Sequence, residues 1–343
     1  MLNVDFADLE TRGFVLVRAF LSDAELREYR IDFDRQPVDA ANRNYRMVPA
    51  SVEANARIRI RVEEVLERVR EQTGLRPDAP QAASYFATGA KGGVRFSWHQ
   101  DHESFFELQN HYDYLNFYIP IVKPLREKSN LCIVPFDVLE RDSPATYRRV
   151  ARGGAARFVR MGGLQLIVCD DAGTVHRMRG DLEHLAHTPM LDAGDLLLLR
   201  GDMIHRTQDA DTDRVALSYR VYRAQSPISR RRLAAGGLMK AIMMANNSER
   251  YERMFKAFDL AGRTEIGAAE LMQALDRMPP VNSCGPRQFL RYLMVQKLKS
   301  GVLGRFVMSV SAMYALAGAG SLINLYYRYA RPLVRPAARS EPS

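Results

Sequence analysis

Three side chains of this 343-residue chain have the types and spacing of a metal-binding set. His99 and Asp101 lie two residues apart, and His205 follows 104 residues after Asp101. In an extended segment, side chains two residues apart point to the same side, so His99 and Asp101 can reach one ion together. Two imidazoles and one carboxylate on one face of an ion form the facial triad of non-heme Fe(II) oxygenases, which leaves three positions open for a 2-oxo acid and dioxygen. An isolated His-x-Asp also fits a turn aspartate beside a surface histidine; the distal His205 favours the metal site.

Arg214 follows His205 by nine residues and opens a strand-like segment that ends near Tyr222. On a strand, Arg214, Ser218 and Arg220 share one face, and the apolar residues between them share the other. An arginine on an inward face needs an anionic partner, because a buried unpaired charge is costly. The distal carboxylate of 2-oxoglutarate would provide that partner in a bidentate pair, and Ser218 would add a hydrogen bond. Arg220 is the alternative anchor, and exposed positions for both arginines remain the other interpretation.

Other polar residues near these segments are further candidates. Asn116 and Tyr118 share one face of a predicted strand and would bind the polar end of the 2-oxo acid, unless they form a hydrogen-bonded pair on a solvated face. Trp98 either walls the site or packs beside the motif. His102 and His111 either line the substrate entrance or are exposed on loops.

Strands must position these residues, because short apolar and β-branched runs separated by Gly, Pro and Asp fill the chain from about residue 81 to 223. These runs cover residues 114–122, 130–136, 164–169, 196–199 and 215–222. Helices are expected after Ser22, where Glu25 completes a capping box, and from Val52 to Thr73, where Gly74 follows. Several short strands with few helices between them predict a sandwich or barrel of antiparallel strands.

The chain divides into three predicted parts. Residues 1–228 form the catalytic domain, residues 229–284 a helical extension, and residues 285–343 a basic, partly apolar helical tail. The extension contains an EF-hand-like frame, with Asp259 at the first ligand position and Glu270 at the twelfth. Ala261 and Arg263 occupy positions that should supply oxygen ligands, so a helical hairpin of EF-hand shape or a coincidence is expected rather than a calcium site.

The net charge of +9 is concentrated at the C-terminal end, where residues 285–343 contain nine Lys and Arg against Glu341 alone. A basic tail on a nearly neutral body favours a membrane surface or an acidic partner over nucleic acid, which is not expected. Residues 306–327 contain no charged side chain. Three readings of that stretch stay open: a spanning anchor, an interfacial helix, or a helix buried against the catalytic domain.

The cysteines and the N-terminus indicate the compartment. Cys132, Cys169 and Cys284 form neither a disulfide framework nor a thiolate metal site, which suits a reducing cytoplasm. The N-terminal segment has early acidic residues and no long apolar run, so a signal peptide is not expected. A cytoplasmic location follows, with membrane association through the tail as an addition.

Taken together, the segments resemble the phytanoyl-CoA dioxygenase family of Fe(II)- and 2-oxoglutarate-dependent oxygenases over about residues 5–225. The resemblance is carried by the opening at residues 13–22, the Trp-His-Gln-Asp motif at 98–101, residues 129–135, Gly194-Asp195 before His205, and Arg214 with Ser218. It implies a mainly β fold with packed helices, a double-stranded β-helix (a cupin-like jelly roll). It also implies Fe(II) at His99, Asp101 and His205, and 2-oxoglutarate anchored by Arg214.

The resemblance further implies a dioxygenase that hydroxylates a small molecule and releases succinate and carbon dioxide. The substrate is unidentified; a lipophilic one would suit a tail near a membrane. Alternatives are desaturation, epimerisation or cyclisation on the same scaffold, or a jelly-roll binding protein without activity. The carboxylate of Asp101 favours hydroxylation, since related halogenases have a small residue there.

Two departures from the family pattern limit what carries over. Pro135 is followed by Phe136-Asp137 where the family has glycine and a small residue. The insert at residues 141–163 and the histidines 176, 184 and 187 match no family motif. Substrate loops commonly lie there in the family, so its coenzyme A substrate cannot be transferred to this chain.

Overall fold

The computed structural model describes residues 4–36, 46–88, 96–161, 164–279 and 285–312. The chain forms two compact units, each built from separate stretches of sequence. The first unit contains residues 1–148 and 180–224, and the second contains residues 149–179 and 225–343. The predicted end of the catalytic domain at residue 228 lies close to the break after Ala224, but residues 149–179 belong to the other unit.

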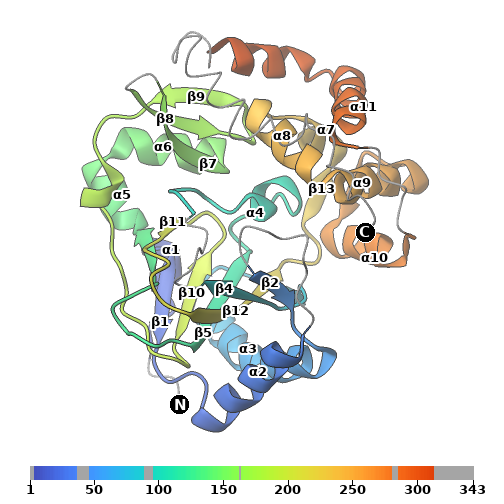
Figure 1. The fold of residues 1–343 in the computed structure, drawn as a ribbon. Coiled ribbons are helices and arrows are strands. Elements are labelled where there is room, and N and C mark those ends of the chain that lie inside the picture. The colour runs from blue at the N-terminus through green and yellow to red at the C-terminus, as the bar shows by residue number, and fades with distance from the viewer. Residues whose placement is uncertain (1–3, 37–45, 89–95, 162–163, 280–284, 313–343) are drawn as a thin grey trace, which may run out of the picture. The chain divides into compact units, whose positions relative to one another are not determined.

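A seven-stranded antiparallel sheet forms the larger layer of the first unit (Figure 1). Its strands run in the order β1 (Phe14–Val17), β10 (Leu196–Arg200), β5 (Leu115–Val122), β12 (Arg214–Tyr222), β4 (Ser84–Thr88) and β2 (Arg46–Pro49), and β3 (Ala79–Pro80) pairs with the end of β12. The central strands β5 and β12 are buried along nearly their whole length. The prediction of an antiparallel β core is therefore confirmed.

A second, smaller layer holds the segments that carry the two predicted histidine ligands. Strands β6 (Leu131–Val134) and β11 (Ile204–Thr207) pair antiparallel. Isolated bridges extend this pair on both sides, joining His99 to His205 and His187 to Ile133. A cluster of buried side chains from both layers, including Phe14, Leu199 and Ala216 with Ile133, fills the space between them. His205 is thereby fixed to the apolar core through its own strand.

Helices cover the opposite face of the large sheet. They include α2 (Asp23–Arg35) and α3 (Val52–Gln72), and the larger hydrophobic cluster unites their apolar side chains with those of β5, β10 and β12. The Ser22–Glu25 capping box is present, with the Ser22 side chain accepting from the Glu25 backbone. The short helices of this unit are α1 (Asp8–Thr11), α4 (His102–Phe106), α5 (Phe136–Asp142) and the 3-10 turn η1 (Leu182–His184). The predicted helix packing on one sheet is confirmed.

The second unit combines a three-stranded antiparallel sheet with helices. The sheet contains β7 (Ala156–Met161), β8 (Leu164–Cys169) and β9 (Thr174–Arg177). The remaining elements are α7 (Arg230–Ala234), α8 (Leu238–Asn246), α9 (Ser248–Ala261), α10 (Ala268–Arg277), α11 (Pro286–Lys299), β13 (Pro227–Ser229) and β14 (Glu265–Gly267), while α6 (Pro144–Gly153) spans the boundary.

Strand β8 corrects one sequence-based assignment. Residues 164–169 are a strand, as predicted, but they pair with β7 and β9 and not with the strands of the first unit. The reason is that both faces are apolar and buried: Leu166 and Val168 pack on Met239 and Ile242 of α8, and Ile167 and Cys169 are buried on the other face. A strand buried on both faces has no sequence pattern that identifies its neighbours.

The EF-hand-like segment forms a helical hairpin without the ligand set of a calcium site. Helices α9 and α10 flank β14, which pairs with β13. Both carboxylates of the frame are held by arginines, Asp259 by Arg230 and Glu270 by Arg263. The structure shows the helical hairpin, and the expectation that it binds no calcium stays a prediction.

Charge is divided unequally between the two units. The first carries 25 Lys and Arg against 31 Asp and Glu, and the second carries 24 against 9, so their net charges are −6 and +15. The near-neutral average of residues 1–284 thus conceals an acidic unit and a basic one.

The structure tests little of the predicted tail. Of residues 306–327, only 306–312 lie within the described part, and the expected membrane contact stays a prediction. Among the described helices, none has the length and apolar character to cross a membrane.

Candidate metal centre

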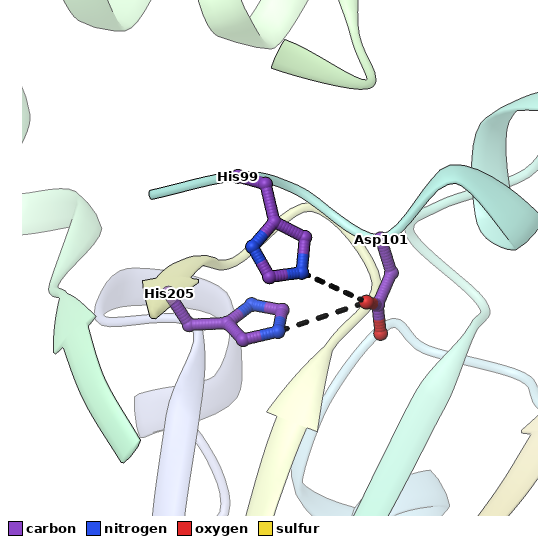
Figure 2. Close-up of side chains that lie close together, drawn as sticks. All are labelled: His99, Asp101 and His205. Atoms are coloured by element: carbon purple, nitrogen blue, oxygen red, sulfur yellow. Dashed lines mark ion pairs between the residues drawn. The ribbon is translucent and has the colours of Figure 1, made fainter. Parts of the chain in front are cut away.

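His99, Asp101 and His205 converge on one point (Figure 2). The Nε2 atoms of His99 and His205 lie 3.7 and 3.6 Å from Asp101 Oδ1, and one ligand atom from each residue lies within 4.8 Å of the others. Two ligand atoms about 2.1 Å from an ion at right angles would be about 3.0 Å apart. Small rotations of these side chains would therefore bring all three atoms onto one ion.

Hydrogen bonds orient both imidazoles for metal binding. His99 Nδ1 lies 2.7 Å from the Ser97 carbonyl oxygen, and His205 Nδ1 lies 3.0 Å from the Met203 carbonyl oxygen. A carbonyl only accepts, so each Nδ1 carries the proton and each Nε2 presents a lone pair toward Asp101. This tautomer is the one a metal-binding histidine needs.

The electrostatic surroundings keep Asp101 ionised. Burial by itself would raise the pKa of its carboxyl, but His205 and His99 in their protonated forms, together with Arg220, outweigh burial and lower that pKa to about 2. The pKa of Glu103 is also lowered, because His102 and Arg220 outweigh the effect of burial. The site therefore offers an anionic ligand throughout the physiological pH range.

The segment that carries His99 and Asp101 is fastened to the turn before His205. Gln100 is buried and donates from Nε2 to the Asp202 carbonyl at 2.7 Å, and Ser104 Oγ donates to the Gly201 carbonyl at 2.8 Å. A Cβ atom on Gly201 would lie 2.8 Å from Ser104 Cβ and from Tyr114 Cδ1, closer than real Cβ atoms approach. Only glycine therefore fits this contact.

Glu183 joins the same two segments from the other side. Its carboxylate accepts from Trp98 Nε1 at 2.8 Å and from Arg206 Nε and Nη2 at 3.0 and 2.7 Å. Trp98 precedes His99 and Arg206 follows His205, so one side chain links the neighbours of two ligands. The Arg206 guanidinium also lies 5.1 Å from the Trp98 ring centroid. We call Glu183, Trp98 and Arg206 the ligand clamp.

The four residues predicted to bind a 2-oxo acid form two neighbouring pairs on β5 and β12. Arg214 donates from Nη1 to the Tyr118 hydroxyl, and Ser218 Oγ donates to Asn116 Oδ1 at 2.8 Å. All four side chains are buried, which excludes the solvated strand face considered for Asn116 and Tyr118. The Arg214 guanidinium also donates to the Ser129 carbonyl at 3.4 Å.

Arg214 has no carboxylate partner within the described residues. Its side chain is buried, and its Nε has no hydrogen-bond partner there. Neutral acceptors alone compensate a buried guanidinium poorly. An anion that enters this position would satisfy it.

The remaining candidates have other surroundings. Trp98 belongs to the ligand clamp. His111 stacks on Phe105 with ring centroids 4.5 Å apart, and its Nε2 lies 3.9 Å from Asp202, so it packs near the turn before His205. His102 Nε2 lies 3.9 Å from Glu103. Arg220 interacts electrostatically with Asp101 and Glu103 and lowers the pKa of both carboxyls. It therefore lies toward the metal-site end of β12 and not beside Arg214.

Two histidines outside the predicted site, His176 and His187, lie in different units. His176 lies in the second unit beside Arg149, whereas His187 bridges Ile133 in the first. Sequence reasoning missed Glu183 and Gln100. A lone glutamate 84 residues after His99 has no distinguishing pattern, but the polar residue between two ligands of an HxD motif was a usable signal for Gln100.

The sequence matches no protein-family model and no curated protein. Comparison with solved structures finds the α-ketoglutarate-dependent carbocyclase SnoK of nogalamycin biosynthesis, with a TM-score of 0.44 and 14% identity over 64% of this chain and 83% of SnoK. The epimerase SnoN of the same biosynthesis has a TM-score of 0.43 and 18% identity over 64% and 82%. HygX from Streptomyces hygroscopicus, solved with nickel and 2-oxoglutarate bound, has a TM-score of 0.41 and 16% identity over 64% and 85%.

Proposed function

We propose that the first unit is an Fe(II)- and 2-oxoglutarate-dependent oxygenase. The observation that carries this proposal is the convergence of His99, Asp101 and His205, with both Nε2 atoms directed to Asp101. Two imidazoles and one carboxylate leave coordination positions on the metal open. This is typical of Fe(II) oxygenases and not of closed structural metal sites. The two antiparallel layers around one core support a double-stranded β-helix as the scaffold.

The second support is the buried cation on β12. We propose that the far carboxylate of 2-oxoglutarate pairs with Arg214 and that the Tyr118 hydroxyl donates to the bound co-substrate. Ser218 would donate to the co-substrate in place of its present acceptor, Asn116 Oδ1. Arg214 would then gain the anionic partner that the described residues do not provide. The planar guanidinium matches a carboxylate in two parallel hydrogen bonds, which a lysine cannot do.

When bound, Fe(II) and 2-oxoglutarate supply the oxidation itself, as dioxygen is consumed and the 2-oxo acid becomes succinate and carbon dioxide. The chain's residues bind and orient the reactants: Ser97 and Met203 hold the imidazoles, and Arg214 fixes the co-substrate. The apolar core between the layers excludes water from the Arg214 end. We propose hydroxylation of a small molecule as the outcome; desaturation, epimerisation and ring closure are outcomes that product analysis would separate.

Succinate formation tests this proposal. Protein purified without oxygen is supplied with Fe(II), 2-oxoglutarate and oxygen, and wild type is compared with His99→Ala, Arg214→Ala and the exposed control Arg126→Ala. Slow turnover without substrate is expected in wild type and control, none in His99→Ala, and a strongly raised KM for 2-oxoglutarate in Arg214→Ala. A wild type that binds neither Fe(II) nor 2-oxoglutarate would favour a binding protein on this scaffold.

A further inference from the structure

Lys123 lies across from Arg214 at the end of the β5–β12 pair. The register aligns Val122 of β5 with Val215 of β12. Because the strands are antiparallel, Lys123, the residue after Val122, lies opposite Arg214, the residue before Val215. A register shift between Val215 and Ala216 marks a β-bulge at this point. Ile121 and Val122 both pack in the cluster beneath the helices, and Lys123 is therefore returned to the inner face that Arg214 occupies.

The ammonium group of Lys123 has no hydrogen-bond partner within the described residues, although its Nζ atom is buried. Burial and, after it, the charge of Arg214 lower the pKa of Lys123 to about 8, against the opposite effect of Asp209, Glu127 and Asp192. A buried donor without an acceptor is costly, and a neighbouring cation increases that cost.

The carboxylate that acts on Lys123 most strongly is already engaged. Asp209 Oδ1 accepts from the Ser129 backbone and hydroxyl at 3.0 Å each and from the Asp211 backbone at 3.1 Å. No ion pair joins Asp209 to Lys123 or Arg214 among the described side chains. The carboxylates of Asp209, Glu127 and Asp192 act on the Lys123 charge, but none forms an ion pair with it among the described side chains. This end of the inner face thus holds two cations without a directly bound carboxylate there.

We propose that Lys123 is a second cationic determinant for the far carboxylate of the co-substrate, acting beside Arg214. This inference rests on the proposed function and narrows it: two cations, one on β12 and one directly after β5, receive the far carboxylate. One arginine fixes the direction of that carboxylate through paired hydrogen bonds. The lysine adds a point charge that a methyl group at the same position could not engage.

Anaerobic binding measurements test the role of Lys123. The Fe(II)-loaded protein is titrated with 2-oxoglutarate, and the visible charge-transfer absorption of the chelated 2-oxo acid reports binding. Lys123→Met is compared with Lys128→Met, the same change at a half-exposed lysine whose Nζ pairs with Asp211 at 3.4 Å. The second ligand is 2-oxopentanoate, which has a methyl group in place of the far carboxylate.

Lys123→Met should raise the Kd for 2-oxoglutarate about tenfold, while Lys128→Met changes it less than about twofold. Binding of 2-oxopentanoate should be the same in both variants and in wild type. Equal Kd values for 2-oxoglutarate in the two variants would overturn the role of Lys123 alone, as would an equal loss for both ligands. A wild type that binds Fe(II) without binding 2-oxoglutarate would overturn the proposed function as well.

Discussion

Replacing Glu183 by alanine should weaken metal binding although no ligand is changed. Glu183 accepts three hydrogen bonds, one from Trp98 and two from Arg206, and these donors adjoin His99 and His205. Without the carboxylate, the two segments of the ligand clamp are joined by fewer contacts. The unloaded site then samples arrangements in which the imidazoles are separated, and metal binding must restore the productive one.

The expected loss of metal affinity depends on how far the Glu183 and Arg206 side chains are exposed to solvent. The Glu183 side chain is 48% exposed and that of Arg206 is 23% exposed, so their ion pair contributes no more than about 1 kcal/mol. The hydrogen bond from Trp98 adds about 1 kcal/mol. A total of about 1–2 kcal/mol limits the loss of affinity to between about fivefold and thirtyfold. Glu183→Gln keeps an acceptor for Trp98 and should lose less than Glu183→Ala.

Anaerobic titration with Co(II), followed by its visible absorption, measures this affinity without turnover. Glu140→Ala is the matched control, because Glu140 is exposed on α5 of the same unit. The expected order of affinity is wild type and control, then Glu183→Gln, then Glu183→Ala. Equal Co(II) affinity in Glu183→Ala and Glu140→Ala would refute the ligand clamp as a positioning device.

Three further predictions concern other parts of the chain. Gly201→Ala should lower the free energy of unfolding by about 2 kcal/mol or more in denaturant titrations, because its Cβ would meet Ser104 and Tyr114; unchanged stability would contradict the close contact. Burial, and then the charge of Lys240, lower the pKa of Lys297 to about 7, so the unfolded chain binds more protons between about pH 7 and 10.5 and stability should rise with pH there. Lys297→Met should remove that part of the rise, which denaturant titrations at several pH values would show. Millimolar Ca²⁺ should leave the melting temperature unchanged, because Glu270 is paired with an arginine; a clear upward shift would indicate a calcium site.

The residues that sequence could place share a local pattern. His99 and Asp101 are two residues apart and therefore lie on the same side of an extended segment. The same two-residue period puts Arg214 and Ser218 on the buried face of β12. These inferences need only the local backbone. The convergence with His205 depended on a long-range pairing, which the resemblance suggested and the bridge between His99 and His205 provides.

The residues that sequence could not place depend on pairings without a local pattern. Strand β8 is apolar on both faces, so nothing in residues 164–169 identifies α8 as its neighbour. Glu183 lies in a 3-10 turn and acquires its role only when Trp98 and Arg206 approach it. Lys123 was missed for a different reason: strict alternation fails at a β-bulge, which one sequence does not reveal.

The inner face of β12 has two ends of different chemistry, and this explains why one strand can carry several arginines. At one end, Arg214 and Lys123 lie together, and neither forms an ion pair with a carboxylate among the described residues. Toward the other, Arg220 interacts electrostatically with the carboxylates of Asp101 and Glu103. Under the proposed function, exchanging the two environments would place the far carboxylate of the co-substrate beside Asp101 and Glu103, which would repel it. Under the proposed function, the bulge at Val215 would serve binding, because it brings Lys123 beside Arg214 at the end proposed to receive a carboxylate.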